Sequence, residues 1–165
     1  MPKQALTPEE VLPLLAATPP RLAALTADLG PAQLQVPRAP EEWSANEVLA
    51  HLRACADMWG AAIVAMIAQD RPTLRAINPR TWINQTDYRE QDFHSSLAAF
   101  ATQRSDLLAV LAPLPPAGWD RTATVTGAGA VLERTVLFYA RWLVNHERPH
   151  LKQIERLVNP RPRAR

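Results

Sequence analysis

Three histidines in two separate predicted helices constrain the fold of this chain more than any other feature. His51 lies early in one amphipathic segment, and His146 and His150 lie one helical turn apart near the end of another. Imidazole nitrogen is a preferred ligand of zinc and similar divalent ions, and three protein ligands with one open position are typical of a catalytic site. The three side chains meet only if their two helices lie side by side and run antiparallel.

Apolar periodicity and capping signals predict four helical segments. The clearest start is Ser44, which forms a capping box with Glu47 ahead of apolar residues at helical spacing. A second capping box begins at Thr7, and the proline pair at 19–20 should divide the segment that follows into two short helices. The only strand-like stretch is Thr122–Val125. The predicted helical ranges are 7–30, 44–70, 90–111 and 130–158.

The order of these helices must bring the histidines together. A simple up-down-up-down bundle makes the second and fourth helices parallel, so one connection has to cross the length of the bundle. The second helix should be about 38 Å long, and the linker at 71–89 extends to about 60 Å at most. We therefore predict an all-α four-helix bundle, up-down-down-up, with a long crossover between the second and third helices.

Length and composition favour one domain without a nucleic-acid partner. The 165 residues are 47% hydrophobic, which suits a single domain over 1–159 followed by a disordered Arg/Pro tail over 160–165. The net charge is +2, and three of the arginines lie in that tail, so the body is close to neutral. Nucleic-acid binding usually needs a basic stripe, and none precedes residue 160.

Several classes of protein are excluded by what the sequence lacks. The single cysteine, Cys55, allows no internal disulfide and no cysteine-based zinc cage, so a metal would be held by histidine and carboxylate. The polar start is unlike a secretory signal, and the longest apolar run, 61–68, is too short to span a bilayer. We expect a soluble cytoplasmic protein with no membrane partner.

Two segments resemble a known family. Residues 43–52 (WSANEVLAHL) and 145–154 (NHERPHLKQI) are similar to the signature segments of the DinB-like (DinB/YfiT) superfamily, and the loop at 118–129 resembles the one that precedes its last helix. The resemblance implies a four-helix bundle in which His51, His146 and His150 bind nickel, zinc or a similar divalent ion. Relatives include thiol S-transferases that use a low-molecular-weight thiol cosubstrate, and they often form homodimers.

Pro149 departs from a regular helix between the two neighbouring ligands. It removes a backbone hydrogen bond and could bend the helix that presents His146 and His150. The same residues match the H-E-x-x-H pattern of zinc proteases, with Glu147 as general base. The further glycine and histidine of that extended motif are absent, so a protease is disfavoured. We expect Glu147 to face solvent or to support a ligand histidine from outside the metal's direct contacts.

Other side chains near the histidines are candidates for the wall of a substrate pocket. Cys55 shares the helix face of His51 and is interpreted as a small buried residue in preference to a ligand or a redox-sensitive thiol. The remaining candidates, for which ordinary core packing is the preferred interpretation, are Met58, Trp59, Tyr139 and Trp142.

The function predicted from the sequence is that of a metal-binding protein acting on small molecules. Thiol-dependent S-transfer to an electrophilic small molecule comes first, and it rests on the resemblance alone. A metal-dependent hydrolase is the alternative enzyme. A metal- or ligand-binding stress protein without turnover is the third hypothesis, because the sequence contains no clear general base or substrate clamp.

Overall fold

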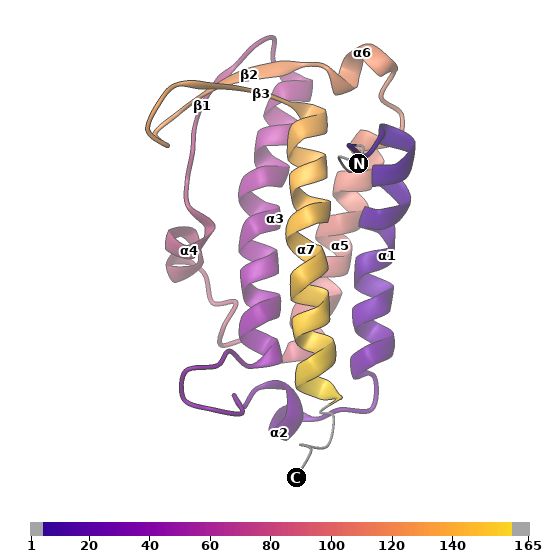
Figure 1. Cartoon of the computed structure of the whole chain (residues 1–165), viewed down its shortest axis with the longest axis vertical. Coiled ribbons are helices and arrows are strands. Elements are labelled where there is room, and N and C mark those ends of the chain that lie inside the picture. The colour runs from indigo at the N-terminus through magenta and orange to yellow at the C-terminus, as the bar shows by residue number, and fades with distance from the viewer. Residues whose placement is uncertain (1–4, 160–165) are drawn as a thin grey trace.

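The computed structural model describes residues 5–159 and contains four long helices side by side (Figure 1). These are α1 (Pro8–Thr26), α3 (Ala45–Ala68), α5 (Phe93–Leu111) and α7 (Val136–Val158). Shorter helices lie in the connections: α2 (Pro31–Leu34), α4 (Pro79–Trp82), the 3₁₀ helix η1 (Ile83–Gln85) and α6 (Pro116–Trp119). The expected helical bundle is the framework of the molecule. The predicted Arg/Pro tail lies outside the described residues.

Both predicted capping boxes start helices. The Thr7 hydroxyl accepts a hydrogen bond from the Glu10 backbone N–H, and the Glu10 carboxylate accepts one from the Thr7 N–H at 2.8 Å. Ser44 and Glu47 exchange the same pair of bonds at 3.1 and 2.7 Å. Each box satisfies backbone donors that a helix start otherwise leaves unpaired. The Ser44 box fixes where α3 begins, and therefore places His51 on the second turn.

The expected break in the first helix is wrong, because α1 runs without interruption through Pro19 and Pro20. A proline at position 19 has no N–H to donate to the carbonyl of Leu15. In the structure Arg104 of α5 donates to that carbonyl at 2.9 Å. A long-range bond therefore replaces the missing local one, which is information that a local sequence pattern does not contain.

Two buried clusters show how the helices run. One packs the first halves of α1 and α7 against the last turns of α3 and α5, and it includes Val11, Leu15, Val136, Ala140, Ile63, Met66, Leu107 and Leu111. The other packs the opposite ends and includes Leu22, Ile154, Val48 and Phe93. Thus α1 and α7 run one way and α3 and α5 the other. The chain between α3 and α5 crosses the length of the bundle (Figure 1).

A small sheet covers the end of the bundle where α3 ends and α7 begins (Figure 1). Its strands, in the order β1-β2-β3, are Thr73–Arg75, Thr122–Thr126 and Leu132–Thr135. The β1 strand pairs parallel to β2, and β3 pairs antiparallel to β2. The brief strand-like stretch near residue 122 is therefore one of three strands, and the fold is mostly helical rather than all-α.

The last helix begins later than predicted. Residues 132–135 form β3, and α7 starts at Val136, where the Thr135 hydroxyl accepts a bond from the Phe138 N–H at 3.0 Å. Leu132, Glu133 and Arg134 favour helix by propensity, but their pairing with β2 decides their conformation. The α7 helix then continues through Pro149, so the proline does not end it.

The third helix begins at Phe93 rather than near Glu90. The carboxylate of Asp92 accepts a hydrogen bond from the Ser95 N–H at 3.0 Å and caps α5 there. Asp at this position is a favoured cap, because its oxygen satisfies a free backbone donor. The predicted end at Leu111 agrees with the structure.

The crossing segment is tied to α3 by a half-buried carboxylate. Asp57 accepts hydrogen bonds from Trp82 Nε1 at 3.0 Å, from the Tyr88 hydroxyl at 2.7 Å and from Gln103 Nε2. The apolar side chain of Ile83 is buried against α3 nearby. These contacts hold α4 against the half of α3 that carries His51.

The α3 helix is long and apolar enough, by length and composition alone, to cross a membrane. In the structure it packs against both α5 and α7, and apolar residues of the three helices share two buried clusters. It also buries the polar side chains of Asn46, His51 and Arg53. We therefore describe α3 as the core helix of the bundle.

Candidate metal centre

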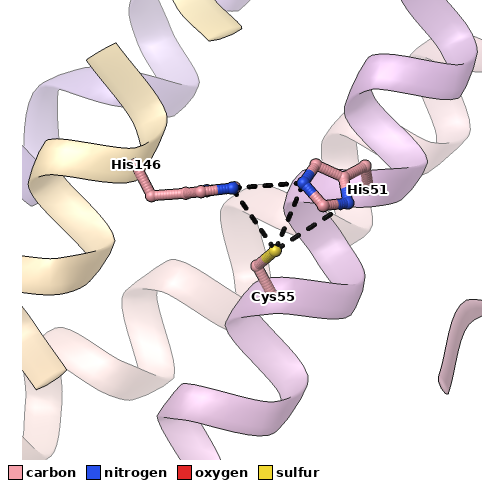
Figure 2. Close-up of side chains that lie close together, drawn as sticks. All are labelled: His51, Cys55 and His146. Atoms are coloured by element: carbon pink, nitrogen blue, oxygen red, sulfur yellow. Dashed lines mark hydrogen bonds between the residues drawn. The ribbon is translucent and has the colours of Figure 1, made fainter. Parts of the chain in front are cut away.

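Donor atoms from α3 and α7 converge between these two helices (Figure 2). His51 Nε2 lies 3.1 Å from His146 Nε2. The Cys55 sulfur lies 3.6 Å from His51 Nε2 and 3.9 Å from His146 Nε2. The ligand atoms of these three residues all lie within 4.8 Å of one another, so they could hold one metal ion.

Helix geometry explains this convergence. His51 and Cys55 are four residues apart on α3, so their side chains project from the same face one turn apart. That face is turned toward α7, which runs in the opposite direction. His51 lies on the second turn of α3, and His146 lies at the middle of α7. The antiparallel packing therefore brings them to the same level of the bundle.

His150 stands beside this group. Its ring centroid is 5.0 Å from that of His51 and 4.7 Å from that of His146, so the three predicted histidines form one cluster of rings. Its Nδ1 is 2.9 Å from Gln153 Oε1, one turn further along α7. The tight group of donor atoms contains Cys55 as its third member, although the sequence favours a core role for this residue.

Two of the histidines are neutral at physiological pH. Burial, together with the neighbouring positive charge of Arg80 and repulsion between the clustered imidazoles, lowers the pKa of His51 and of His146 to about 4. Burial and the negative charge of Glu147 raise the pKa of the Cys55 thiol to about 12. In the metal-free protein the imidazoles therefore offer lone pairs, whereas the cysteine remains a thiol.

The low pKa values predict how the metal-free protein responds to acid. An unfolded histidine titrates near 6.5, so between pH 6.5 and about 4 the unfolded chain binds protons that the native His51 and His146 do not. Stability should therefore fall as the pH falls through this window, and this contribution is absent above pH 6.5. Urea unfolding of chelator-treated protein across the window measures it. His51→Gln should make the stability depend less on pH. An unchanged pH profile of stability would contradict the low pKa assigned to His51.

The donor set suits a divalent ion. Two neutral imidazoles whose Nε2 atoms lie 3.1 Å apart can share one N–H···N hydrogen bond, in which one ring donates and the other accepts. A tetrahedral zinc ion would separate two imidazole nitrogens by about 3.3 Å, which is close to the observed distance. His146 Nδ1 is also buried, with no hydrogen-bond partner within residues 5–159. The hydrogen bonds of the cluster therefore do not close among these residues, and its imidazole and thiol groups are donors that a divalent ion accepts.

Aromatic rings wall the histidines on two sides. Trp59 lies edge-on to His146 with a centroid distance of 5.0 Å, and Trp43 lies edge-on to His51 at 5.4 Å. Trp142 packs against Trp59 and is 48% exposed. Of the other pocket candidates, Met58 and Tyr139 line an apolar cavity of about 310 Å³ together with Trp59. Trp59 therefore separates that cavity from His146.

An open cleft lies on the other side of the histidines. It has a volume of about 570 Å³, and its lining includes His150, Trp43 and Arg80. A smaller cavity lined by His51 shares Trp43 and Arg80. Sequence reasoning missed both shared residues. Trp43 directly precedes the Ser44 cap and stands inside the family-like segment, so it could have been noticed, whereas Arg80 lies in the linker and carries no periodic signal.

The expectation for Glu147 is wrong, because it neither faces solvent nor contacts a histidine. It is 3% exposed and forms a buried ion pair with Arg104 of α5, and Thr18 of α1 donates to it at 2.9 Å. As the residue after His146, it projects about 100° further around α7, toward α1 and α5. A carboxylate held in this way cannot act as a general base beside the histidines, which removes the protease interpretation.

Most of the bundle sequence matches a family model. The model described as the DinB superfamily matches residues 14–154, which include both helices that carry the histidines. This chain belongs to the DinB superfamily. The resemblance drawn from residues 43–52 and 145–154 is therefore confirmed.

A solved structure shares the fold. YfiT from Bacillus subtilis superimposes with a TM-score of 0.77 at 19% sequence identity, covering 95% of this chain and 90% of that chain. That protein is described as "a probable metal-dependent hydrolase with an unusual four-helix bundle topology". No curated protein matches the sequence. At this identity the likeness establishes the fold that this DinB protein shares with YfiT.

Proposed function

We propose that this DinB protein is a metal-dependent hydrolase of small molecules, with His51 and His146 as two of the ligands. The observation that carries the proposal is the pair of neutral imidazole nitrogens 3.1 Å apart. His51 of this pair lines a small cavity, and the neighbouring His150 lines the open cleft. Two side chains border this pair closely enough to supply a third ligand. They are His150, the ligand implied by the family resemblance, and Cys55.

A divalent ion at this position would polarise a substrate carbonyl or phosphoryl group and lower the pKa of water from 15.7 to about 7. The protein supplies the ligands of the ion and fixes their orientation. The low pKa values of His51 and His146 keep their lone pairs free at neutral pH. Packing against Trp43 and Trp59 fixes the orientation of both rings.

Two further groups face the cleft. If His150 donates its Nδ1 proton to Gln153, its Nε2 is left free to accept a proton from a reacting water. Arg80, carried by α4, adds a positive charge that would stabilise negative charge developing on a substrate oxygen. A small-molecule substrate suits a cleft of this volume.

Hydrolysis replaces thiol transfer as the leading hypothesis. YfiT is described as a probable hydrolase, and nothing in the comparisons supports a transferase. The choice of ion, zinc or nickel, and the assembly of the chain into a homodimer are parts of the proposal that the comparisons do not address.

A panel of activated nitrophenyl esters, amides and phosphoesters tests the proposal. We expect chelator-treated protein to be inactive, zinc or nickel to restore turnover, and His51→Ala to remove it. His94→Ala is the matched control, because His94 is exposed and contacts the Leu29 carbonyl rather than the cluster. Equal rates with and without metal would contradict the proposal. Metal-dependent conjugation of a thiol to a halonitrobenzene, without hydrolysis, would return the transferase to first place.

A further inference from the structure

A second cavity lies beyond Trp59, outside the metal centre. It has a volume of about 310 Å³ and is lined by residues of α3, of the small sheet and of α7. Tyr139 of α7 lines it, and this residue stands two helical turns, or about 10 Å along the axis, before His146. Small-molecule sites in proteins have volumes from about 300 Å³ upward. The cavity is therefore large enough to hold a ligand of its own.

Small and apolar side chains form most of the lining. Ala61, Ala62 and Ala65 provide the side of the cavity that belongs to α3. Leu74 of β1 and Val125 of β2 are partners in the parallel strand pair, and both line the cavity from the sheet. Surfaces of this kind bind the hydrocarbon part of a ligand, because contact removes apolar area from water.

Arg75 is the one charged residue that the structure places on this lining. It is exposed on β1, and neither of the two ion pairs among residues 5–159 includes it. A Cβ at Gly127 would lie 3.2 Å from Cγ of Arg75, so the glycine leaves the arginine room. No aspartate or glutamate of the described chain lines the cavity. An apolar cavity therefore carries one positive charge without a neighbouring acid to balance it.

Tyr139 adds a second polar group to the lining. Its side chain is half-buried, and burial raises the pKa of its hydroxyl, which therefore keeps its proton at neutral pH. A protonated phenol donates a hydrogen bond, and so does a guanidinium. Both polar side chains are thus donors, which favours a ligand with an acceptor of negative charge.

We propose that this cavity is a second binding site, and that its ligand is a small apolar carboxylic acid about the size of a phenyl ring with a short chain. The hydrocarbon part lies between the alanines of α3 and the pair Leu74 and Val125. The carboxylate accepts hydrogen bonds from Arg75 and Tyr139, and arginine is the side chain best suited to this group. The site goes beyond the proposed hydrolase activity and needs no metal ion.

Calorimetric titration with 4-phenylbutyrate, 2-naphthoate and octanoate tests the proposal. We expect at least one of these acids to bind the purified protein with one site per chain. The corresponding alcohol should bind about tenfold more weakly, because it lacks the charge. Arg75→Gln should weaken binding of the acid by about three- to tenfold, since this arginine is exposed to solvent. Ala65→Phe should abolish binding, because the ring fills the cavity.

Two further variants serve as controls. Ala61→Phe is a second filling variant at an exposed position of the same lining, and it should also abolish binding. Arg156→Gln is matched to Arg75→Gln, because Arg156 is an exposed arginine that lines the cleft beside His150. It should leave the affinity for the acid unchanged. Circular dichroism of each variant confirms that the fold is intact.

His51→Ala separates this inference from the proposed function. This variant should lose the metal ion and keep its affinity for the acid. Binding that is lost in His51→Ala or Arg156→Gln but unchanged in Ala65→Phe would place the acid at the metal centre or in the cleft, and would overturn the second site. Equal affinity for acid and alcohol would overturn the proposed class of ligand. Absence of saturable binding for all three acids would overturn the proposal and leave the metal centre standing.

Discussion

Replacement of Glu147 by alanine is expected to lower the free energy of unfolding by about 3–5 kcal/mol. Glu147 and Arg104 are 3% and 2% exposed and pair with each other across α7 and α5. Removal of the carboxylate leaves a buried guanidinium without its counter-charge. Thr18, which donates to Glu147 from α1, also loses its acceptor. Urea denaturation followed by circular dichroism measures the change.

The surface pair Arg21–Glu155 provides the control. Its side chains are 54% and 47% exposed, so Glu155→Ala should cost less than about 1 kcal/mol. A double replacement, Arg104→Met with Glu147→Leu, should cost less than Glu147→Ala, because no unpaired charge remains. Equal small losses of unfolding free energy for Glu147→Ala and Glu155→Ala would show that the buried ion pair does not stabilise the bundle.

Replacement of His51 or His146 by alanine should weaken zinc binding at least about 100-fold. Loss of a partner outside the direct contacts of a metal typically costs 10–100-fold, and loss of a direct ligand should cost more. Competition with a chromophoric chelator measures the affinity, and His94→Ala should leave it unchanged. Wild-type affinity in both His51→Ala and His146→Ala would remove these residues from the site.

Much of the framework could be predicted because its signals are local. The Ser44 capping box fixes the start of α3, and the spacing of apolar residues after it predicts a helix that the structure contains. The positions of His51 and His146 then required antiparallel packing of two helices, and α3 and α7 run that way. One local signal and one long-range requirement were therefore enough to predict that α3 and α7 pack antiparallel.

The errors arose where a long-range contact overrides a local preference. Pro19 and Pro20 favour a break, but Arg104 donates to the Leu15 carbonyl that Pro19 leaves free. The segment at 132–135 favours helix, but β2 offers it a pairing partner. Glu147 has the polarity of a surface residue, and its burial depends on an arginine on another helix. In each case the deciding partner is distant in the sequence.

The site was predictable in part, because its histidines lie in segments with a local sequence signature. His51, His146 and His150 stand in family-like segments, and the structure brings their rings together. Cys55 has the residue type of a buried core position, and only its distance to two imidazole nitrogens distinguishes it as a candidate ligand. Arg80 reaches the cleft because α4 is anchored to Asp57 through Trp82, a contact that spans residues 57–82.

The central claim is that one divalent ion binds between α3 and α7, and anomalous diffraction from zinc-soaked crystals tests it most directly. The account predicts a single strong zinc peak between the helices, about 2.0–2.1 Å from the Nε2 atoms of His51 and His146, and no such peak in His51→Ala crystals. A map without density there, with zinc only at surface carboxylates or at His94, would contradict it.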